Sequence, residues 1–233
     1  WHSSLMKAHH PQADTDIDPQ DPARQRLAYD EILSNQLTIE LVRLQQTRAR
    51  GHARNGDADL IAKARAALPF TLTGSQERAV ADIAKDLASE DRMHRLLQGD
   101  VGSGKTAVAF LSMVQALGPV NENGLRAQAA ILAPTEILAR QHEKNISAFA
   151  AKCGLQVATL TGRDKGKARD KILAEIASGQ AQIVIGTHAL FQEDIAFHDL
   201  ALVVIDEQHR FGVHQRLQLS EKGHRADVLT GQR

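Results

Sequence analysis

The chain has 233 residues, of which 42% are apolar and only 3% aromatic; this length fits one large domain or one domain with an appendage, and a core of small aliphatic residues suits parallel α/β architecture better than a β-sandwich. The 28 lysines and arginines balance 28 aspartates and glutamates, so the net charge gives no signature of nucleic-acid binding, although a local basic patch would still allow it. The single Cys153 excludes an internal disulfide framework and indicates a reducing, cytoplasmic environment, and no apolar run approaches the ~20 residues of a membrane span, so we expect no membrane partner.

The N-terminal segment, residues 1–21, is expected to be an irregular connector, because proline and aspartate recur along it. His9 and His10 are adjacent, but no ligand cluster follows them, so we do not expect a metal site there. The segment also lacks an initiator methionine and the apolar stretch of a signal peptide. We therefore expect the chain to be an internal part of a longer protein.

From Pro22 onward the sequence predicts one long helix that ends near Gly51. Pro22 suits a first helical turn, and apolar residues follow at near-helical spacing: Leu27, Ile32, Leu37, Leu41 and Leu44. An ordinary packed helix is the favoured interpretation, and a spacer between domains is the alternative. A polar break and a short helix over residues 60–68 come next. We divide the chain into a connector with a long linker helix, residues 1–64, and a domain of residues 65–233.

The second part alternates between apolar strands and amphipathic helices, a pattern that predicts a parallel sheet sandwiched by helices. The strands are predicted at residues 93–98, 127–133, 155–161, 181–187 and 200–206, with a further short strand at 225–229. The helices are predicted at residues 104–117, 136–153 and 167–179.

One glycine-rich turn in this part carries a specific signal. Residues 99–106 read GDVGSGKT, a full match to the phosphate-binding loop pattern G-x-x-x-x-G-K-[ST], between a predicted strand and a predicted helix. Glycines let the backbone N–H groups turn inward and cradle phosphates, while Lys105 reaches the outer phosphates and the Thr106 hydroxyl binds Mg²⁺. The nucleotide-binding residues predicted from the loop are Gly99, Asp100, Val101, Gly102, Ser103, Gly104, Lys105 and Thr106.

The other half of such a site is an acidic residue at the end of another strand. Asp206 and Glu207 follow the apolar run at 200–205, and the carboxyl ends of parallel strands meet at one edge of a sheet. Asp206 would hold Mg²⁺, and Glu207 would polarise the attacking water. A carboxamide can pair with adenine, and no N-K-x-D guanine motif is present, so Gln76 indicates ATP. The alternative for Asp206 and Glu207 is a turn that merely ends the strand, and the alternative for Gln76 is a glutamine on a helix surface.

The motifs LTGSQ, GDVGSGKT, APTEILARQH, GTHAL and DEQH occur in the order of motifs Q, I, Ia, Ib and II of superfamily 2 helicases. With its longer runs LTGRDKGKAR and DEQHRFGVHQR, nearly the whole chain resembles the RecG family of bacterial ATP-dependent DNA helicases. The resemblance implies that residues 65–233 are the first RecA-like domain of a motor that uses ATP and Mg²⁺. It also implies duplex and branched DNA as partners, such as stalled replication forks and Holliday junctions.

The resemblance assigns roles to individual residues. Lys105, Asp206 and Glu207 would be catalytic, and Gln208 and His209 would relay the nucleotide state to the DNA side. Four further residues would lie along the DNA backbone: Thr135, Arg140, Thr187 and His188. The two threonines are also ordinary helix N-caps. The basic run at 162–171 fits a solvated helix face as well as a phosphate contact.

The chain departs from the family at its end. After RADVL the family continues into a Ser/Thr-Ala-Thr motif and a second RecA-like domain with arginine fingers, whereas this chain ends in TGQR. The wedge domain is absent too, so we expect the isolated chain to be nearly inactive. The translocase module of transcription-repair coupling factor is an alternative family, disfavoured by Gln208. A nucleotide-switched binding module without motor activity is a further alternative. An RNA helicase is another, disfavoured because the box reads DEQH in place of DEAD.

Overall fold

The computed structural model describes residues 1–47, 51–100, 102–192, 194–207 and 226–232. It divides into two compact units, Trp1–Arg48 and Ala49–Arg233, which are described separately below. The boundary predicted between residues 64 and 65 lies inside helix α3 (Ala58–Ala67), which packs on helices of the second unit. Within the described residues, no helix has the length and apolar character needed to cross a membrane.

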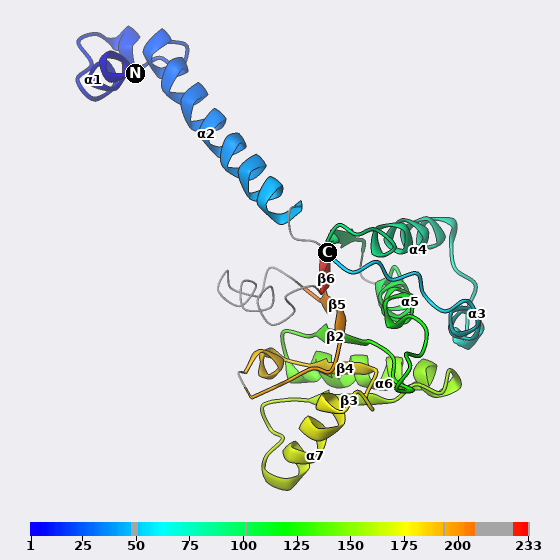
Figure 1. Ribbon diagram of the computed structural model, residues 1–233. Helices are drawn as coiled ribbons and strands as arrows, with labels where there is room; N and C mark the ends of the chain where they lie inside the picture. Colours follow the sequence, from blue (N-terminus) through cyan, green and yellow to red (C-terminus); the bar gives the residue numbers. More distant parts are fainter. Residues whose placement is uncertain (48–50, 101, 193, 208–225, 233) are drawn as a thin grey trace. The chain divides into compact units, whose positions relative to one another are not determined.

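The first unit contains helix α1 (His2–His9), a 3-10 turn η1 (Asp14–Ile17) and the long helix α2 (Pro22–Thr47), drawn in blue in Figure 1. The expectation of an irregular connector is therefore wrong for much of residues 1–21. Lys7 connects α1 to η1 and to the start of α2, since its Nζ lies 3.0 Å from Asp16 Oδ1 and 2.6 Å from Asp21 Oδ2. Helix α2 begins at Pro22 as predicted.

Several apolar residues along the described part of α2 are exposed, although Ala23 is buried and Leu27 is half-buried. Ile32 and Leu37 are both exposed, and so is Tyr29. The choice between an ordinary packed helix and a spacer between domains stays a prediction, since nothing is described of the side chains of Leu41 and Leu44.

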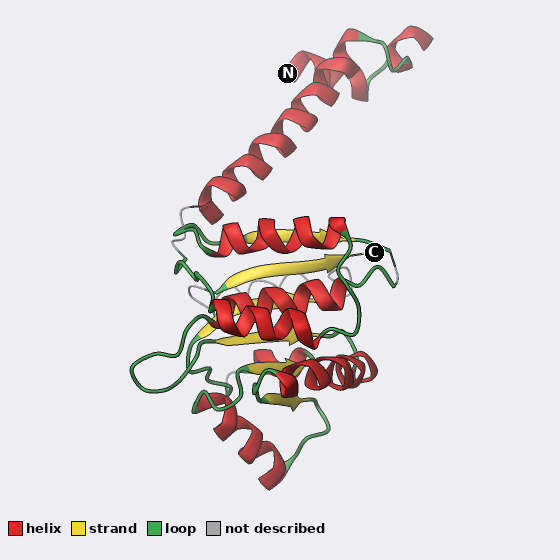
Figure 2. Cartoon of the chain, turned by 90° about the vertical axis from the view of Figure 1, so that its right-hand side faces the viewer, coloured by secondary structure: helices red, strands yellow, loops and turns green. Residues whose placement is uncertain are grey.

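The second unit is built on a sheet of six parallel strands in the order β1-β6-β5-β2-β4-β3. Figure 2 shows its strands in yellow, with helices packed along them in red. The predicted strands are confirmed, and the last of them runs three residues further than expected. The strands are β1 (His94–Gln98), β2 (Gln128–Leu132), β3 (Val157–Leu160), β4 (Ile183–Gly186), β5 (Leu200–Ile205) and β6 (Asp227–Gln232).

Helices cover the sheet on both faces, as the strand pattern predicted. Besides α3 they are α4 (Gly74–Leu87), α5 (Lys105–Leu117), α6 (Glu136–Lys152), α7 (Gly166–Ala177) and a 3-10 turn η2 (His188–Phe191). Alternate strand residues belong to two separate apolar clusters: Ile131 and Val204 to one, Leu132 and Val203 to the other. Because successive strand side chains point to opposite faces, both faces of the sheet are buried.

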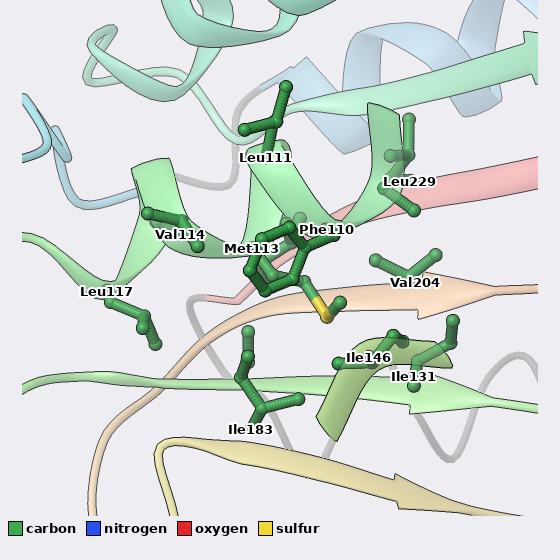
Figure 3. Packing of buried hydrophobic residues seen from close by; sticks show 14 of the residues in the cluster. Phe110, Leu111, Met113, Val114, Leu117, Ile131, Ile146, Ile183, Val204 and Leu229 are labelled. Atoms are coloured by element: carbon green, nitrogen blue, oxygen red, sulfur yellow. The ribbon is translucent and has the colours of Figure 1, made fainter. Parts of the chain in front are cut away.

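Helix α5 forms the centre of the larger cluster. Nearly every residue from Ala107 to Leu117 is buried, as expected for a helix that is apolar on all sides. Phe110 packs against Phe149 of α6, with ring centroids 5.6 Å apart. Figure 3 shows the α5 side chains directed at residues of the sheet and of α6: Phe110, Met113, Val114 and Leu117 with Ile131, Ile146, Ile183 and Val204. This packing fixes the start of α5, and with it the loop that precedes the helix.

Asp227, the first residue of β6, is a buried acid that gives folding a pH dependence. Its side chain is 3% exposed and accepts a hydrogen bond from the Met93 N–H at 2.6 Å. Burial raises the pKa of Asp227 from 3.8 to about 6, against the opposing effects of the Met93 N–H and the Arg92 cation. The folded state therefore holds this proton more tightly than the unfolded chain, so ionisation of Asp227 destabilises the fold.

We expect Asp227→Asn to flatten the stability profile between about pH 4 and pH 7. The contribution of Asp227 is fully present below its ordinary pKa of 3.8 and is lost as the pH rises through about 6, a loss of at most ~3 kcal/mol. The asparagine side chain carries no charge and still offers an oxygen to the Met93 N–H. Urea unfolding of both chains at pH 4.5, 5.5 and 7.0 measures the difference, with the exposed Glu122→Gln as control. Parallel pH profiles for wild type and Asp227→Asn would contradict the assignment.

Candidate functional site

The loop of residues 99–104 joins the end of β1 to the start of α5. Gly102 and Gly104 have φ angles of 81° and 80°, a left-handed conformation that favours glycine. A Cβ on Gly104 would collide with Gln76 Nε2, and one on Gly99 would lie 2.7 Å from Ser103 Oγ. The loop thus needs glycine for its conformation at two positions and for close approach at Gly99. Val101 lies outside the described residues.

Lys105, the first residue of α5, is directed back over the loop. Its ammonium group donates hydrogen bonds to the carbonyl oxygens of Gly99 and Asp100, the latter at 2.7 Å. The positive charge and the N-terminus of α5 therefore lie together at the loop, as the motif predicted. Such an arrangement attracts anions, because helix N-termini carry unpaired N–H groups.

Gln76 connects helix α4 to the loop. Its Oε1 accepts a hydrogen bond from the Thr73 N–H at 2.8 Å, and its Nε2 donates to the Ser103 carbonyl at 2.8 Å. Thr73 in turn caps α4, a helix that the strand-and-helix pattern did not predict. The contact of Gln76 with adenine stays a prediction. A hollow of about 450 Å³ adjoins this segment and includes Phe70, an exposed aromatic ring, and Glu77.

The acidic pair follows β5 directly. Asp206 is partly buried, and its N–H donates to the Leu132 carbonyl at 2.9 Å. Glu207 is 9% exposed and has a φ of 51°, the only described non-glycine residue with a positive φ. A non-glycine residue in this conformation costs of order 1 kcal/mol and recurs at functional sites.

Asp206 has a partner that sequence reasoning missed. His142 Nε2, from α6, lies 2.9 Å from Asp206 Oδ2. Burial acts to raise the pKa of Asp206, but the hydrogen bond from His142, the Glu207 N–H and the Lys105 charge outweigh it, so the pKa lies below its ordinary value. Asp206 is therefore ionised at neutral pH. The signal available in the sequence was a histidine in an otherwise apolar row on α6: Ala139, His142, Ile146 and Ala150.

The structure brings the predicted phosphate loop and acidic pair into one cavity of about 420 Å³. This follows from the strand order, because β6 alone lies between β1 and β5 and all three strands end at the same edge. The polar residues that line the cavity are Ser103, Lys105, Thr106, Gln141, His142, Asn145, Asp206 and Glu207.

The lining fits a magnesium ion bound together with a nucleotide. Thr106 offers a hydroxyl and Asp206 an ionised carboxylate, and oxygen ligands suit Mg²⁺. Among the described residues there is no group of three or more His, Cys, Asp or Glu side chains that could hold a metal alone. Mg²⁺ typically takes one or two protein ligands and completes its shell with phosphate and water, so this donor set is sufficient.

The four residues expected at the DNA backbone follow β2 and β4, two adjacent strands. Thr135 caps α6, its Oγ1 accepting from the Leu138 N–H at 3.3 Å, and Arg140 pairs with Glu143 Oε2 at 2.9 Å. His188 is exposed, whereas Thr187 is 2% exposed and its Oγ1 has no partner among the described groups. The DNA roles of all four stay predictions. Gln208 and His209 lie outside the described residues.

The basic run at 162–171 is largely ion-paired. Arg163 Nε lies 2.7 Å from Glu136 Oε2, and Arg169 Nη2 lies 2.8 Å from Asp194 Oδ2. These pairs are compatible with both interpretations of the run, a solvated helix face and a phosphate contact.

The chain is similar in sequence to known helicases. The chain is 49% identical to the ATP-dependent DNA helicase RecG of Haemophilus influenzae over 205 residues, which is 88% of this chain and 29% of that protein. It is 42% identical to RecG of Bacillus subtilis, over 89% of this chain and 30% of that protein. The resemblance to RecG helicases is thus confirmed, and the chain spans about three tenths of the length of these relatives.

Solved structures give the same fold. A structure of RecG bound to a three-way DNA junction matches with a TM-score of 0.76 and 38% identity, covering 98% of this chain and 29% of that one. S. cerevisiae Dbp5, in a complex with ADP, matches with a TM-score of 0.56 and 21% identity, over 76% of this chain and 46% of that one. At this identity the match shows only that the two chains share a fold. The RecA-like fold predicted from the motifs is confirmed. The DEAD/DEAH box helicase model matches residues 73–230. Because this match spans well over half of the chain, the chain belongs to the DEAD/DEAH box helicase family.

Proposed function

We propose that this chain is the ATP-binding half of the motor of a DNA helicase and translocase that remodels branched DNA, such as stalled replication forks and Holliday junctions, in the cytoplasm. The observation that carries the proposal is the single cavity shared by the phosphate loop and the acidic pair. The resemblance to RecG relatives supplies the class of substrate. We propose that the full-length protein has two further parts. One is a second RecA-like domain, which completes the motor, and the other is a wedge domain.

The geometry suits ATP hydrolysis, with a distinct role for each group of residues. The loop amides and Lys105 would hold the phosphates, and Thr106 and Asp206 would hold a magnesium ion, which would supply positive charge at the transferred phosphoryl group. Glu207 orients and deprotonates the attacking water.

The segments beside the cavity complete the proposed motor site. Gln76, in the first turn of α4, contacts the adenine, and the purine ring stacks on Phe70. Both residues belong to the segment that the Gln76 side chain joins to the phosphate loop. Gln208 and His209 pass the nucleotide state toward the DNA side.

The proposed DNA edge of the sheet lies beside this cavity. Thr135, Arg140 and His188 are exposed after β2 and β4, at the edge where β5 places Asp206. Hydroxyls, helix N-termini and cations are groups that contact phosphate backbones without reading sequence. A motor that tracks DNA needs this kind of contact.

ATP hydrolysis by the full-length protein tests the proposal, measured with forked DNA, duplex DNA, RNA and no nucleic acid. We expect forked DNA to stimulate hydrolysis most and RNA to have no effect. Equal rates with and without DNA would favour a nucleotide-switched binding module, and stimulation by RNA alone would favour an RNA helicase. The isolated chain should bind the nucleotide and hydrolyse it slowly.

A further inference from the structure

His142 lies inside the nucleotide cavity, but no motif assignment gives it a role. The residue is 8% exposed, in a row of α6 where Ala139, Ile146 and Ala150 are fully buried. Burying a polar side chain among apolar residues costs folding free energy unless hydrogen bonds compensate for the lost water. The contact that His142 makes is the one with Asp206 Oδ2, at 2.9 Å.

The two ring nitrogens of His142 differ in their surroundings. Nδ1 is buried and has no hydrogen-bond partner among the described groups, whereas Nε2 faces the carboxylate. An ionised carboxylate only accepts hydrogen bonds, so Nε2 carries the proton that joins the two side chains. The hydrogen bonding of His142 is thus directed at Asp206 alone within the described structure.

The second oxygen of Asp206 faces a different environment. Gly231 of β6 also lines the cavity, and a Cβ there would lie 3.4 Å from Asp206 Oδ1. A side chain at this position would fill the space beside Oδ1, which glycine leaves open. His142 therefore holds Oδ2, whereas Oδ1 lies on the Gly231 side of the carboxylate, which also accepts the Glu207 N–H.

We propose that His142 is a positioning residue of the magnesium site: its Nε2–H holds Asp206 Oδ2 and leaves Oδ1 for the metal. This inference rests on the proposed function, since it needs Mg²⁺ to accompany a nucleotide. Groups that orient a metal ligand commonly contribute 10–100-fold to metal affinity. The contact also joins α6, whose first turn follows Thr135 at the proposed DNA edge, to the metal carboxylate.

Two variants of matched length separate the hydrogen bond from packing. In His142→Gln the amide Nε2 lies the same number of bonds from Cα as the histidine Nε2, whereas His142→Met fills similar space without a donor. Binding of a fluorescent non-hydrolysable ATP analogue to the chain is followed as Mg²⁺ is titrated. We expect His142→Met to need roughly tenfold more Mg²⁺ for half-maximal binding, and His142→Gln to stay near wild type. Affinity for the analogue in EDTA should be unchanged in both.

Three results would overturn the role of His142. The first is an unaltered Mg²⁺ requirement in His142→Met. The second is an equal rise of the Mg²⁺ requirement in both variants, because the hydrogen-bond donor would then be irrelevant. The third is weaker analogue binding in EDTA, since His142 would then shape the whole pocket. Melting curves verify folding, and His142→Leu serves as a second donor-free variant. Wild-type chain that binds no analogue at any Mg²⁺ concentration overturns the proposed function itself, before any variant is compared.

Discussion

Lys105→Ala is expected to lower the rate of ATP hydrolysis by the full-length protein about 10³-fold. The ammonium group lies at the N-terminus of α5, held by the carbonyl oxygens of Gly99 and Asp100. In the proposed reaction it stabilises negative charge on the outer phosphates, inside a cavity where fixed charges act more strongly than in water. Its removal takes away this charge and also two hydrogen bonds within the loop.

Two further variants serve as controls. Lys105→Met keeps the apolar stem but removes the ammonium group, with its charge and both hydrogen bonds, so it should lose hydrolysis as fully as the alanine variant. Lys85→Ala, which removes an exposed lysine of α4, should hydrolyse ATP at the wild-type rate. Steady-state hydrolysis with saturating forked DNA measures all three. A Lys105→Ala rate within about threefold of wild type would show that the nucleotide lies elsewhere.

The strands and the loop were predictable because their signals are local. The runs AAIL, IVIG and LALVVI are apolar on both faces of the sheet, and the motif at 99–106 contains its own turn and helix start. Since parallel strands end at one edge, the meeting of Lys105 with Asp206 also followed from the sequence. The strand and loop predictions needed no knowledge of which strands are neighbours, whereas the short distance between the ends of β1 and β5 is set by the strand order.

Features that depend on packing between distant segments were missed. Asp206 pairs with His142, 64 positions earlier, and a histidine in an apolar helix row does not reveal which strand end faces it. From the sequence, Asp227 is an ordinary polar residue near the start of a strand. In the structure it is buried and accepts a hydrogen bond from the Met93 N–H, 134 positions away. Thr187 has the sequence of a helix cap, but its hydroxyl is enclosed beneath the surface. In the N-terminal segment, Lys7 pairs with Asp16 and Asp21, contacts that composition does not indicate.

Glu207→Gln is expected to separate binding from chemistry. Glutamine has the shape of glutamate and can take the same left-handed conformation, so the strand end should keep its geometry at φ 51°. It cannot accept the proton of the attacking water, so hydrolysis should fall by about 10²–10⁴-fold. Affinity for Mg²⁺ and the ATP analogue should stay at the wild-type value, because Asp206 and Thr106 are unaltered.

Asp206→Asn provides the contrast, since the two carboxylates are adjacent in sequence and line the same cavity. This substitution removes the ionised metal ligand, so the variant should need more Mg²⁺ for binding and also hydrolyse slowly. Single-turnover hydrolysis and analogue binding, measured on both variants of the full-length protein, give two independent readings. If Glu207→Gln weakened Mg²⁺-dependent binding as much as Asp206→Asn, Glu207 would be a metal ligand rather than the base. If it hydrolysed ATP at the wild-type rate, the base would have to be another group in the cavity.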